Sequence, residues 1–538
     1  MKKIIFTTVM YGSIFILLAF NTIFSQVNQG WITTYNGSAN GNDMAKSIAL
    51  DGMGNVFVTG FSPSNTSAGD YTTLKYNSAG AEQWVARYSS GRCNSITTDN
   101  SGNVYVTGEG MELLSLYPDY ATVKYNFAGV QQWVRKYKGP GNGYDVASKI
   151  VADGSGNVYV TGKSSGSGSQ NGLDYATIKY NSAGDSVWVR RYNGPGNSED
   201  EANSIDIDNS GNVYVTGLSI GSGTGYDFAT IKYNPEGILL WIARYNGPGN
   251  SEDEANSIVV DGSGSVYVTG GSYGSVFYPD YCTIKYNSAG VQQWVARYDG
   301  PGNWDDVAHS IDTDNSGNVF VTGYSYGNGT GEDYATIKYN SAGVQQWVAR
   351  YSGIGNSYDI AWSIAVDDSA NVYVTGDGYP LYFVTIKYNS TGIQQWVSKD
   401  IFGGGRSIAV DGSFNVYVTG YNMGTGTGSD YATIKNPQII SNIKQISSEI
   451  PEQFNLSQNY PNPFNPATNL EFGISDLGFV TLIVYDLLGK EVATLVNEKL
   501  NPGNYKVEFD GSGLPSGIYF YRLTAGEFTD TKRMMLVK

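Results

Sequence analysis

The chain has 538 residues and a formal net charge of −16 at pH 7. This charge argues against a nucleic-acid partner, because phosphate binding requires clustered lysine and arginine. Aromatic residues make up 14% of the chain, with 43 tyrosines and 69 glycines. Short strands joined by tight turns have this composition. We therefore predict an all-β protein.

The first 25 residues have the features of a secretory signal peptide. Lys2 and Lys3 precede an apolar run over residues 4–20, and cleavage is expected near Ser25. A retained membrane anchor is the alternative, although polar residues interrupt the run. We predict a signal peptide over residues 1–25 and hence an exported protein.

Residues 31–436 contain a four-strand motif repeated eight times. Its strands are Ser-Ile-x-x-Asp (strand A), Asn-Val-Tyr-Val-Thr-Gly (B), Tyr-Ala-Thr-Ile-Lys-Tyr (C) and Trp-Val-Ala-Arg-Tyr (D). The threonines of strand B recur at intervals mostly close to 53 residues, at Thr59, Thr107, Thr161, Thr216, Thr269, Thr322, Thr375 and Thr419. A four-strand unit of this length predicts a β-propeller whose blades are antiparallel meanders.

The two ends of the repeat array complement each other. The array opens on a lone D strand at residues 31–35 and closes on a C strand at residues 430–435 that no D strand follows. Pairing these strands would complete the last blade and remove two open edges. We predict eight four-stranded blades, closed by pairing of the N-terminal strand with the last blade. The eight D-strand tryptophans are expected to be buried in the packing.

One stretch of the repeat carries a family resemblance. The unit Ser-Ile-Ala-Val-Asp-x-Ser-x-Asn-Val-Tyr-Val-Thr-Gly, at residues 363–376 and 407–420, resembles the bacterial β-propeller repeat of the SBBP family. That family is named for seven blades, so the count of eight departs from its name. The resemblance implies the fold and an extracellular setting, and it transfers no catalytic residue.

The tail differs in kind from the repeats. A linker is predicted at residues 437–452, and alternating strands over residues 453–538 predict a small β-sandwich. Its conspicuous motifs are Tyr-Pro-Asn-Pro-Phe-Asn-Pro at 460–466, Asp-Leu-Leu-Gly-Lys at 486–490 and Lys-Arg-Met-Met-Leu-Val-Lys at 532–538. This order resembles the type A C-terminal sorting domain of the type IX secretion system. An ordinary carbohydrate-binding or immunoglobulin-like module is the alternative.

The sorting-domain resemblance has implications for location and partners. It implies type IX secretion machinery and a surface sortase as partners of residues 453–538, and a protein secreted from, or held on, the outer-membrane surface of a Gram-negative bacterium. We expect a monomer without a cofactor. Calcium is not supported, because the Asp-Asn-Ser-Gly-Asn turns place glycine fourth, where an EF-type loop needs it sixth.

The repeats differ in length only in the D–A and B–C links. Both kinds of link emerge at the same end of a meander, so the variable loops share one face of the ring, where we expect a ligand. An aspartate precedes strand A in six blades, and a ring of these carboxylates is a candidate site for a cation or a basic peptide. These residues are Asp43, Asp145, Asp200, Asp253, Asp306 and Asp359. The alternative is that each carboxylate accepts N–H groups of the loops.

Three of the variable links are shortened. They are the D–A links before Ser95 and Ser407 and the B–C link at residues 377–381, all within the arc that spans the ring closure. We predict a notch in this arc, suited to stacking on a sugar or a peptide. Its border would be formed by Tyr117, Tyr379, Tyr382 and Tyr421.

The sequence offers little for catalysis. His309 is the only histidine and takes an asparagine position of the repeat, so no Ser-His-Asp set exists. We therefore expect a secreted or cell-surface binding or structural module with a glycan or peptide ligand, and not an enzyme. The alternative is a surface hydrolase or lyase that acts on polysaccharide or peptide with carboxylates at the propeller mouth.

Overall fold

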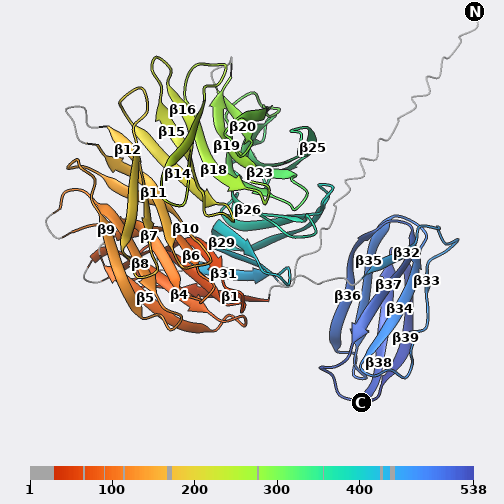
Figure 1. Cartoon of the computed structure of the whole chain (residues 1–538). Coiled ribbons are helices and arrows are strands. Elements are labelled where there is room, and N and C mark those ends of the chain that lie inside the picture. Colours follow the sequence, from red (N-terminus) through yellow and green to blue (C-terminus); the bar gives the residue numbers. More distant parts are fainter. Residues whose placement is uncertain are drawn as a thin grey trace, which may run out of the picture.

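The computed structural model describes residues 30–64, 67–89, 91–112, 115–166, 172–274, 278–355, 357–424, 428–436 and 443–538. All the regular secondary structure among these residues consists of β-strands, which confirms the predicted fold class (Figure 1). The predicted signal peptide lies outside the described residues. The described ranges contain no helix that is long and apolar enough to cross a membrane.

Six blades are separate four-stranded antiparallel sheets, each with its strands in chain order. Blade 1 contains β2 (Met44–Leu50), β3 (Val56–Ser64), β4 (Ser67–Tyr76) and β5 (Glu82–Ser89), and blade 2 contains β6 (Gly91–Thr98), β7 (Val104–Gly110), β8 (Asp119–Tyr125) and β9 (Gln131–Tyr137). Blade 3 contains β10 (Asp145–Ala152), β11 (Val158–Ser165), β12 (Leu173–Tyr180) and β13 (Ser186–Tyr192), and blade 4 contains β14 (Asp200–Ile207), β15 (Val213–Ile220), β16 (Tyr226–Tyr233) and β17 (Leu239–Tyr245). Blade 5 contains β18 (Asp253–Val260), β19 (Val266–Tyr273), β20 (Pro279–Tyr286) and β21 (Gln292–Tyr298), and blade 6 contains β22 (Asp306–Thr313), β23 (Val319–Gly327), β24 (Gly331–Tyr339) and β25 (Gln345–Tyr351).

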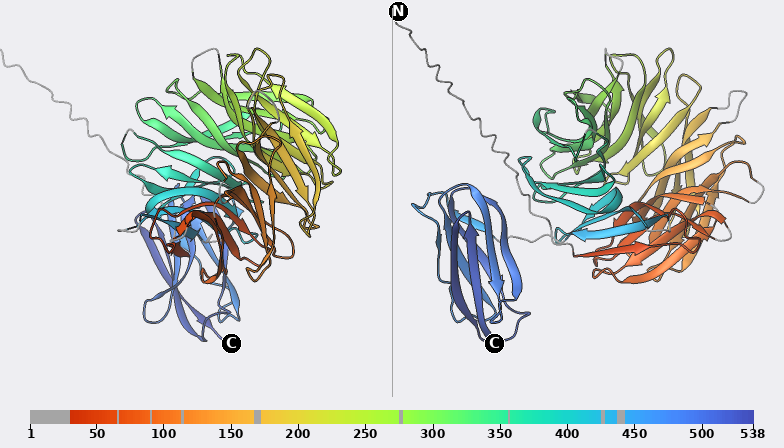
Figure 2. Two further views of the ribbon diagram at one scale, coloured as in Figure 1. Left: turned by 90° about the vertical axis from the view of Figure 1, so that its left-hand side faces the viewer. Right: turned by 180° about the vertical axis from the view of Figure 1, so that it is seen from behind.

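The last two blades share one strand. A seven-stranded sheet contains β26 (Ile360–Val366), β27 (Val372–Gly378), β28 (Tyr382–Tyr388), β29 (Gln394–Val410), β30 (Val416–Met423), β31 (Ser429–Asn436) and β1 (Trp31–Tyr35). The first half of β29 pairs with β28 as strand D of blade 7, and its second half pairs with β30 as strand A of blade 8. The described residues therefore form eight four-strand units around a common centre (Figure 2).

The ring closes as the sequence predicts. Strand β1 pairs antiparallel with β31, with Thr33 opposite Thr433. The Tyr431 hydroxyl donates to the Thr72 carbonyl of blade 1 at 3.3 Å, and the Trp31 indole N–H donates to Ser78 at 3.2 Å. The first and last blades thus meet through the same contacts as other neighbouring blades.

Strands B and C are buried on both sides between neighbouring blades. Val213, Tyr214 and Val215 of β15 are fully buried, as the unbroken apolar pattern predicts. Inside this layer the hydroxyls of Thr216 and Thr230 lie 3.0 Å apart and bond to each other. Strand A is innermost, because the A strands of successive blades pack on one another.

The D-strand tryptophans join each blade to the next. Trp188 lies between Tyr159 of its own blade and Tyr233 of the next, and its indole N–H donates to the Pro235 carbonyl at 3.1 Å. The prediction that the eight tryptophans are buried is nevertheless wrong for five of them, because strand D is the outermost strand of the blade. Only Trp133, Trp188 and Trp396 are buried, whereas Trp31, Trp84, Trp241, Trp294 and Trp347 are partly exposed.

A glycine in each C–D turn makes this contact possible. Gly237 has φ of +76°, and an added Cβ would lie 2.8 Å from the Trp188 ring. Lys179 also reaches this turn, because its Nζ donates to the Pro235 carbonyl at 3.1 Å. The repeated lysine therefore donates to a backbone carbonyl of the next blade.

The tail is a sandwich of two four-stranded sheets. One contains β32 (Lys444–Ser447), β37 (Gly503–Asp510), β34 (Ala467–Ile474) and β33 (Asn455–Leu456), and the other β36 (Glu491–Leu500), β35 (Gly478–Tyr485), β38 (Gly517–Ala525) and β39 (Phe528–Leu536). Leu470, Leu482, Tyr521 and Leu523 belong to the core between the sheets. Strand β32 lies in the segment predicted as a linker, where it pairs with β37 and covers an edge that would otherwise be open.

Candidate functional site

The variable links join the strand ends on one side of the ring. The constant A–B and C–D turns join the strand ends on the opposite side. In blade 3 the constant A–B turn is closed by Asp153, which accepts N–H bonds from Ser155 and Asn157 at 2.9 Å. The D–A link before this blade and its B–C link leave the opposite ends of the strands. We call the side that carries the D–A and B–C links the variable face.

The six aspartates before strand A are fully buried. Each accepts the backbone N–H of a glycine six residues earlier, in the D–A link, at distances from 2.6 to 2.9 Å. In four blades the second oxygen accepts the N–H of a residue that follows strand B or ends it: Ser165, Tyr273, Tyr326 and Tyr379. Asp43, Asp145, Asp200, Asp253, Asp306 and Asp359 therefore fasten the D–A link, and in those four blades tie it to strand B.

Burial also affects the titration of four of these carboxyls. It raises the pKa of Asp306 to about 6, and it raises the pKa of Asp200, Asp253 and Asp359 as well. The cause is the loss of hydration of the charged form, which the loop N–H groups only partly offset.

The four predicted notch tyrosines have different surroundings. Tyr379 is 46% exposed, Tyr382 contacts Phe402 edge-on at 6.5 Å, and Tyr421 lies 5.1 Å from the Arg406 guanidinium. These three belong to blades 7 and 8. Tyr117 belongs to blade 2, and its ring contacts Tyr144, with centroids 4.9 Å apart.

The shortened link before Ser407 forms no loop at all. Strand β29 runs without interruption from Gln394 to Val410, so blades 7 and 8 are joined by continuous strand. Before Ser95, β5 ends at Ser89 and β6 begins at Gly91. In both places strand D leads into strand A with at most one residue between the strands.

His309 has the contact that asparagine makes in other blades. Asn203 and Asn256 donate their amide N–H to an alanine carbonyl of the next blade at 3.0 and 2.9 Å. The His309 Nδ1–H donates in the same way to Ala361 at 3.0 Å, and the ring stacks on Trp362 at 4.4 Å. Burial lowers its pKa to about 4, so the imidazole is neutral at pH 7.

Beyond His309, a cluster continues along the inner strands of blades 7 and 8. Arg406 lies 5.2 Å from the Trp362 ring and bonds both Asp377 oxygens at 2.7 Å, and the Trp362 indole N–H donates to Asp377 at 2.8 Å. Sequence reasoning missed this cluster. Its signal is that Trp362 and Arg406 occupy the repeat position held by Asn203. Its polar groups are bonded to one another.

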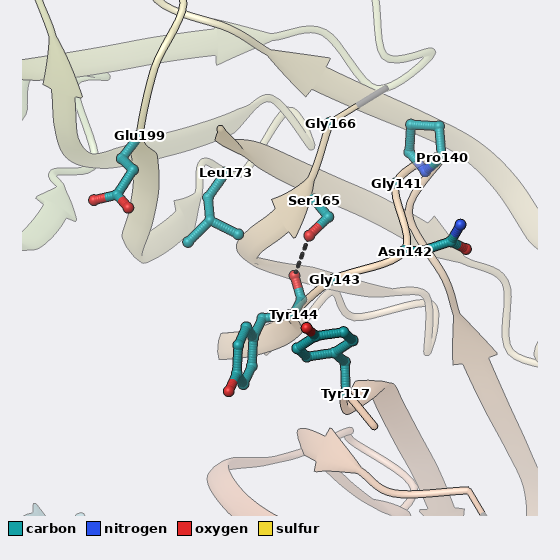
Figure 3. A pocket seen from close by; sticks show the side chains of 10 residues that line it. All are labelled: Tyr117, Pro140, Gly141, Asn142, Gly143, Tyr144, Ser165, Gly166, Leu173 and Glu199. Atoms are coloured by element: carbon teal, nitrogen blue, oxygen red, sulfur yellow. Dashed lines mark hydrogen bonds between the residues drawn. The ribbon is translucent and has the colours of Figure 1, made fainter. Parts of the chain in front are cut away.

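A pocket of about 570 Å³ opens on the variable face between blades 2, 3 and 4 (Figure 3). Its lining residues are Tyr117, Pro140, Gly141, Asn142, Gly143, Tyr144, Ser165, Gly166, Leu173 and Glu199. Figure 3 shows the rings of Tyr117 and Tyr144 beside each other, with Leu173 and Glu199 on neighbouring elements. These two tyrosines are 38% and 52% exposed.

A smaller pocket of about 220 Å³ lies beside it, since both are lined by Pro140 and Gly166. The smaller pocket is lined by the Asp174–Arg191 ion pair, whose closest atoms are 2.7 Å apart. We call these two adjacent pockets the groove; aromatic rings line the larger one, and a paired carboxylate and guanidinium line the smaller one. The sequence pointed to Tyr117 but not to its partner Tyr144.

Three carboxylates could hold a cation by their geometry. Oxygens of Asp280, Asp299 and Asp306 lie within 4.8 Å of one another. However, Asp280 is paired with Arg297 at 2.8 Å, and both Asp306 oxygens accept loop N–H bonds. A cation there would have to compete with partners supplied by the protein itself.

Two family models match the chain. Residues 458–538 match the secretion system C-terminal sorting domain. Residues 83–110, 132–168, 187–223 and 293–329 match the β-propeller repeat of the SBBP family. No curated protein matches the chain.

The solved structures that match the chain have low identity to it. PorZ, a surface component of the type IX secretion system of Porphyromonas gingivalis, is 12% identical with a TM-score of 0.39, over 93% of this chain and 74% of PorZ. The β-propeller domain of the Trilobed protease of Pyrococcus furiosus is 8% identical with a TM-score of 0.40, over 64% and 93%. A gluconolactonase of Xanthomonas campestris is 11% identical with a TM-score of 0.29, over 49% and 82%.

Proposed function

We propose that this chain, which carries SBBP β-propeller repeats and a type IX C-terminal sorting domain, is a binding module delivered to the cell surface. The tail directs the chain across the outer membrane, where a surface sortase acts on it. The propeller then presents the variable face to a ligand outside the cell.

The groove beside Tyr117 and Tyr144 is the observation that carries this proposal. Two large rings stay exposed on a face where most loops are built from glycine, serine and asparagine. Exposed aromatic rings in a concave site are typical of ligand contact. Tyr144 is also held in place, because its carbonyl accepts the Ser165 N–H at 3.0 Å and the Ser165 hydroxyl at 3.3 Å.

Binding is favoured over hydrolysis by the groups around the larger pocket. Among its lining residues, Glu199 is the single carboxylate, and it accepts a hydrogen bond from the Tyr226 hydroxyl at 2.8 Å. A glycosidase needs two carboxyls flanking the scissile bond, in environments that separate their pKa values. The larger pocket supplies one.

Export and binding can be tested separately. Truncation after Glu452 should retain the propeller in the periplasm of a host with a type IX system, measured by fractionation and surface proteolysis. Normal surface delivery of the truncated chain would contradict the role of the tail. For binding, Tyr144→Ala should abolish retention of the intact protein on any ligand found by glycan and peptide arrays, with the melting temperature unchanged.

A further inference from the structure

A second aromatic patch occupies the equivalent place three blades further round the ring. Tyr278 precedes Pro279 and Asp280 at the end of the B–C link of blade 5, as Tyr117 precedes Pro118 and Asp119 in blade 2. Trp304 lies in the D–A link that follows, two residues before Asp306. The two patches therefore come from the same two links of different blades.

The rings of this second patch form a continuous surface. The Tyr278 and Trp304 centroids are 4.6 Å apart, and Trp304 and Tyr326 are 6.0 Å apart, both with an angle of 34° between the ring planes. Trp304 is 53% exposed, close to the 52% of Tyr144. The patch thus presents an exposed indole ring to solvent, as the first presents an exposed phenol ring.

Both patches rest on the same buried anchor. Asp145 accepts the N–H groups of Gly139 and Ser165 at 2.9 and 3.1 Å. Asp306 accepts those of Gly300 and Tyr326 at 2.6 and 3.1 Å. Because each carboxylate holds a D–A link against strand B, Tyr144 and Trp304 are fixed before a ligand arrives.

The chemistry of the surroundings suits a sugar. Tilted, exposed rings offer flat apolar faces to the C–H side of a pyranose, and neighbouring carboxylates accept its hydroxyl groups. Glu199 stands beside the first patch and Asp305 immediately follows Trp304 in the second. The net charge of −16 disfavours an acidic polymer.

We propose that these two patches are equivalent subsites for a neutral polysaccharide, so that one propeller holds the polymer at two points of its variable face. This inference rests on the proposed binding function. Two linked subsites raise the apparent affinity for a polymer about 10²- to 10⁴-fold over a single subsite without a new contact. An oligosaccharide too short to reach both subsites should show only the weaker affinity.

The test measures both the number of binding sites per chain and the affinity for the polymer. Calorimetric titration of the full-length protein with neutral gluco-, manno- and xylo-hexasaccharides should give two sites per chain with the best ligand. Tyr144→Ala and Trp304→Ala should each leave one site and weaken polymer binding about 10²- to 10⁴-fold, and the double variant should not bind. Trp304→Phe, which keeps an aromatic face, should retain the second site.

A matched control excludes loss of folding. Phe127 is 44% exposed and lies in a C–D turn, on the opposite face, so Phe127→Ala should change neither stoichiometry nor affinity. Unchanged melting temperatures of all variants would show that the ring is intact.

The outcomes separate the inference from the function beneath it. Binding of acidic oligogalacturonate or of peptides, lost in Tyr144→Ala, would overturn the assignment to a neutral sugar and keep the binding function. One site per chain, insensitive to Trp304→Ala, would overturn the second subsite. Absence of binding to neutral and acidic glycans and to peptides alike would overturn both.

Discussion

The two faces of the propeller differ in how much the repeat varies. We call the side that carries the A–B and C–D turns the constant face. On the constant face, Asp208 accepts N–H bonds from Ser210 and Asn212 at 2.9 Å, and the same turn recurs from blade to blade. On the variable face, buried aspartates keep the loop ends fixed while the loop residues change from Gly143-Tyr144 to Trp304-Asp305. Repetition therefore marks the residues that build the ring, and departures from it mark those available for binding.

The largest test of this contrast is the closure of the ring. Deletion of residues 26–40 removes β1, exposes the edge of β31 and removes the Trp31 bond to Ser78. We expect the melting temperature to fall by roughly 10 °C or more, since several contacts of about 1 kcal/mol each are lost together. Calorimetry measures this. Removal of residues 26–29 alone is the control, and an equal effect of both deletions would contradict closure by β1.

A single glycine on the constant face should matter almost as much. Gly237→Val places a β-branched side chain at φ of +76° and against the Trp188 ring, so we expect a loss on the order of 3 kcal/mol in the free energy of unfolding. Gly262→Ala is the matched control, because no atom lies within 4 Å of its added Cβ. Urea unfolding compares the two, and equal stabilities would refute the inter-blade contact.

Stability should also depend on pH through Asp312, a half-buried carboxyl of strand β22. Burial raises the pKa of Asp312 from 3.8 to about 6. The folded state therefore holds this proton more tightly than the unfolded chain does, and the stabilisation present below pH 4 is lost as the pH rises through about 6. In Asp312→Asn this loss, on the order of 2 kcal/mol, should disappear from the pH dependence between 4 and 7. Parallel curves for both proteins in urea unfolding would contradict it.

The smallest effect is expected at His309. Because the histidine replaces an asparagine of the repeat and keeps its bond to Ala361, His309→Asn should change the free energy of unfolding by less than about 1 kcal/mol. Binding on the variable face should be unaffected. A large loss of binding or activity in this variant would assign the histidine a direct role in the function. It would also contradict the distinction between residues that build the ring and residues that bind.

The repeat made much of the fold predictable, because its pattern is local. The strand order, the pairing of β1 with β31 and the single face of variable links all follow from motif order and link length. The partial exposure of Trp241 and the uninterrupted strand β29 do not follow from motif order or link length. They depend on how far strand D lies from the centre and on how two blades meet.

The candidate site was less predictable for the same reason. Tyr117 could be singled out from the sequence, whereas its contact with Tyr144 joins two links of different blades. The stack of His309 on Trp362 likewise crosses from blade 6 to blade 7. Spacing within one repeat carries no information on such pairs, because loop conformation brings them together.

Hydrogen exchange of the full-length protein with and without saturating neutral hexasaccharide tests the central claim most directly. We predict slower exchange in the variable links at residues 115–118, 138–144 and 299–305, and no change in constant turns such as residues 208–212. Protection confined to the constant turns, or spread equally over both faces, would contradict the assignment of binding to the variable face.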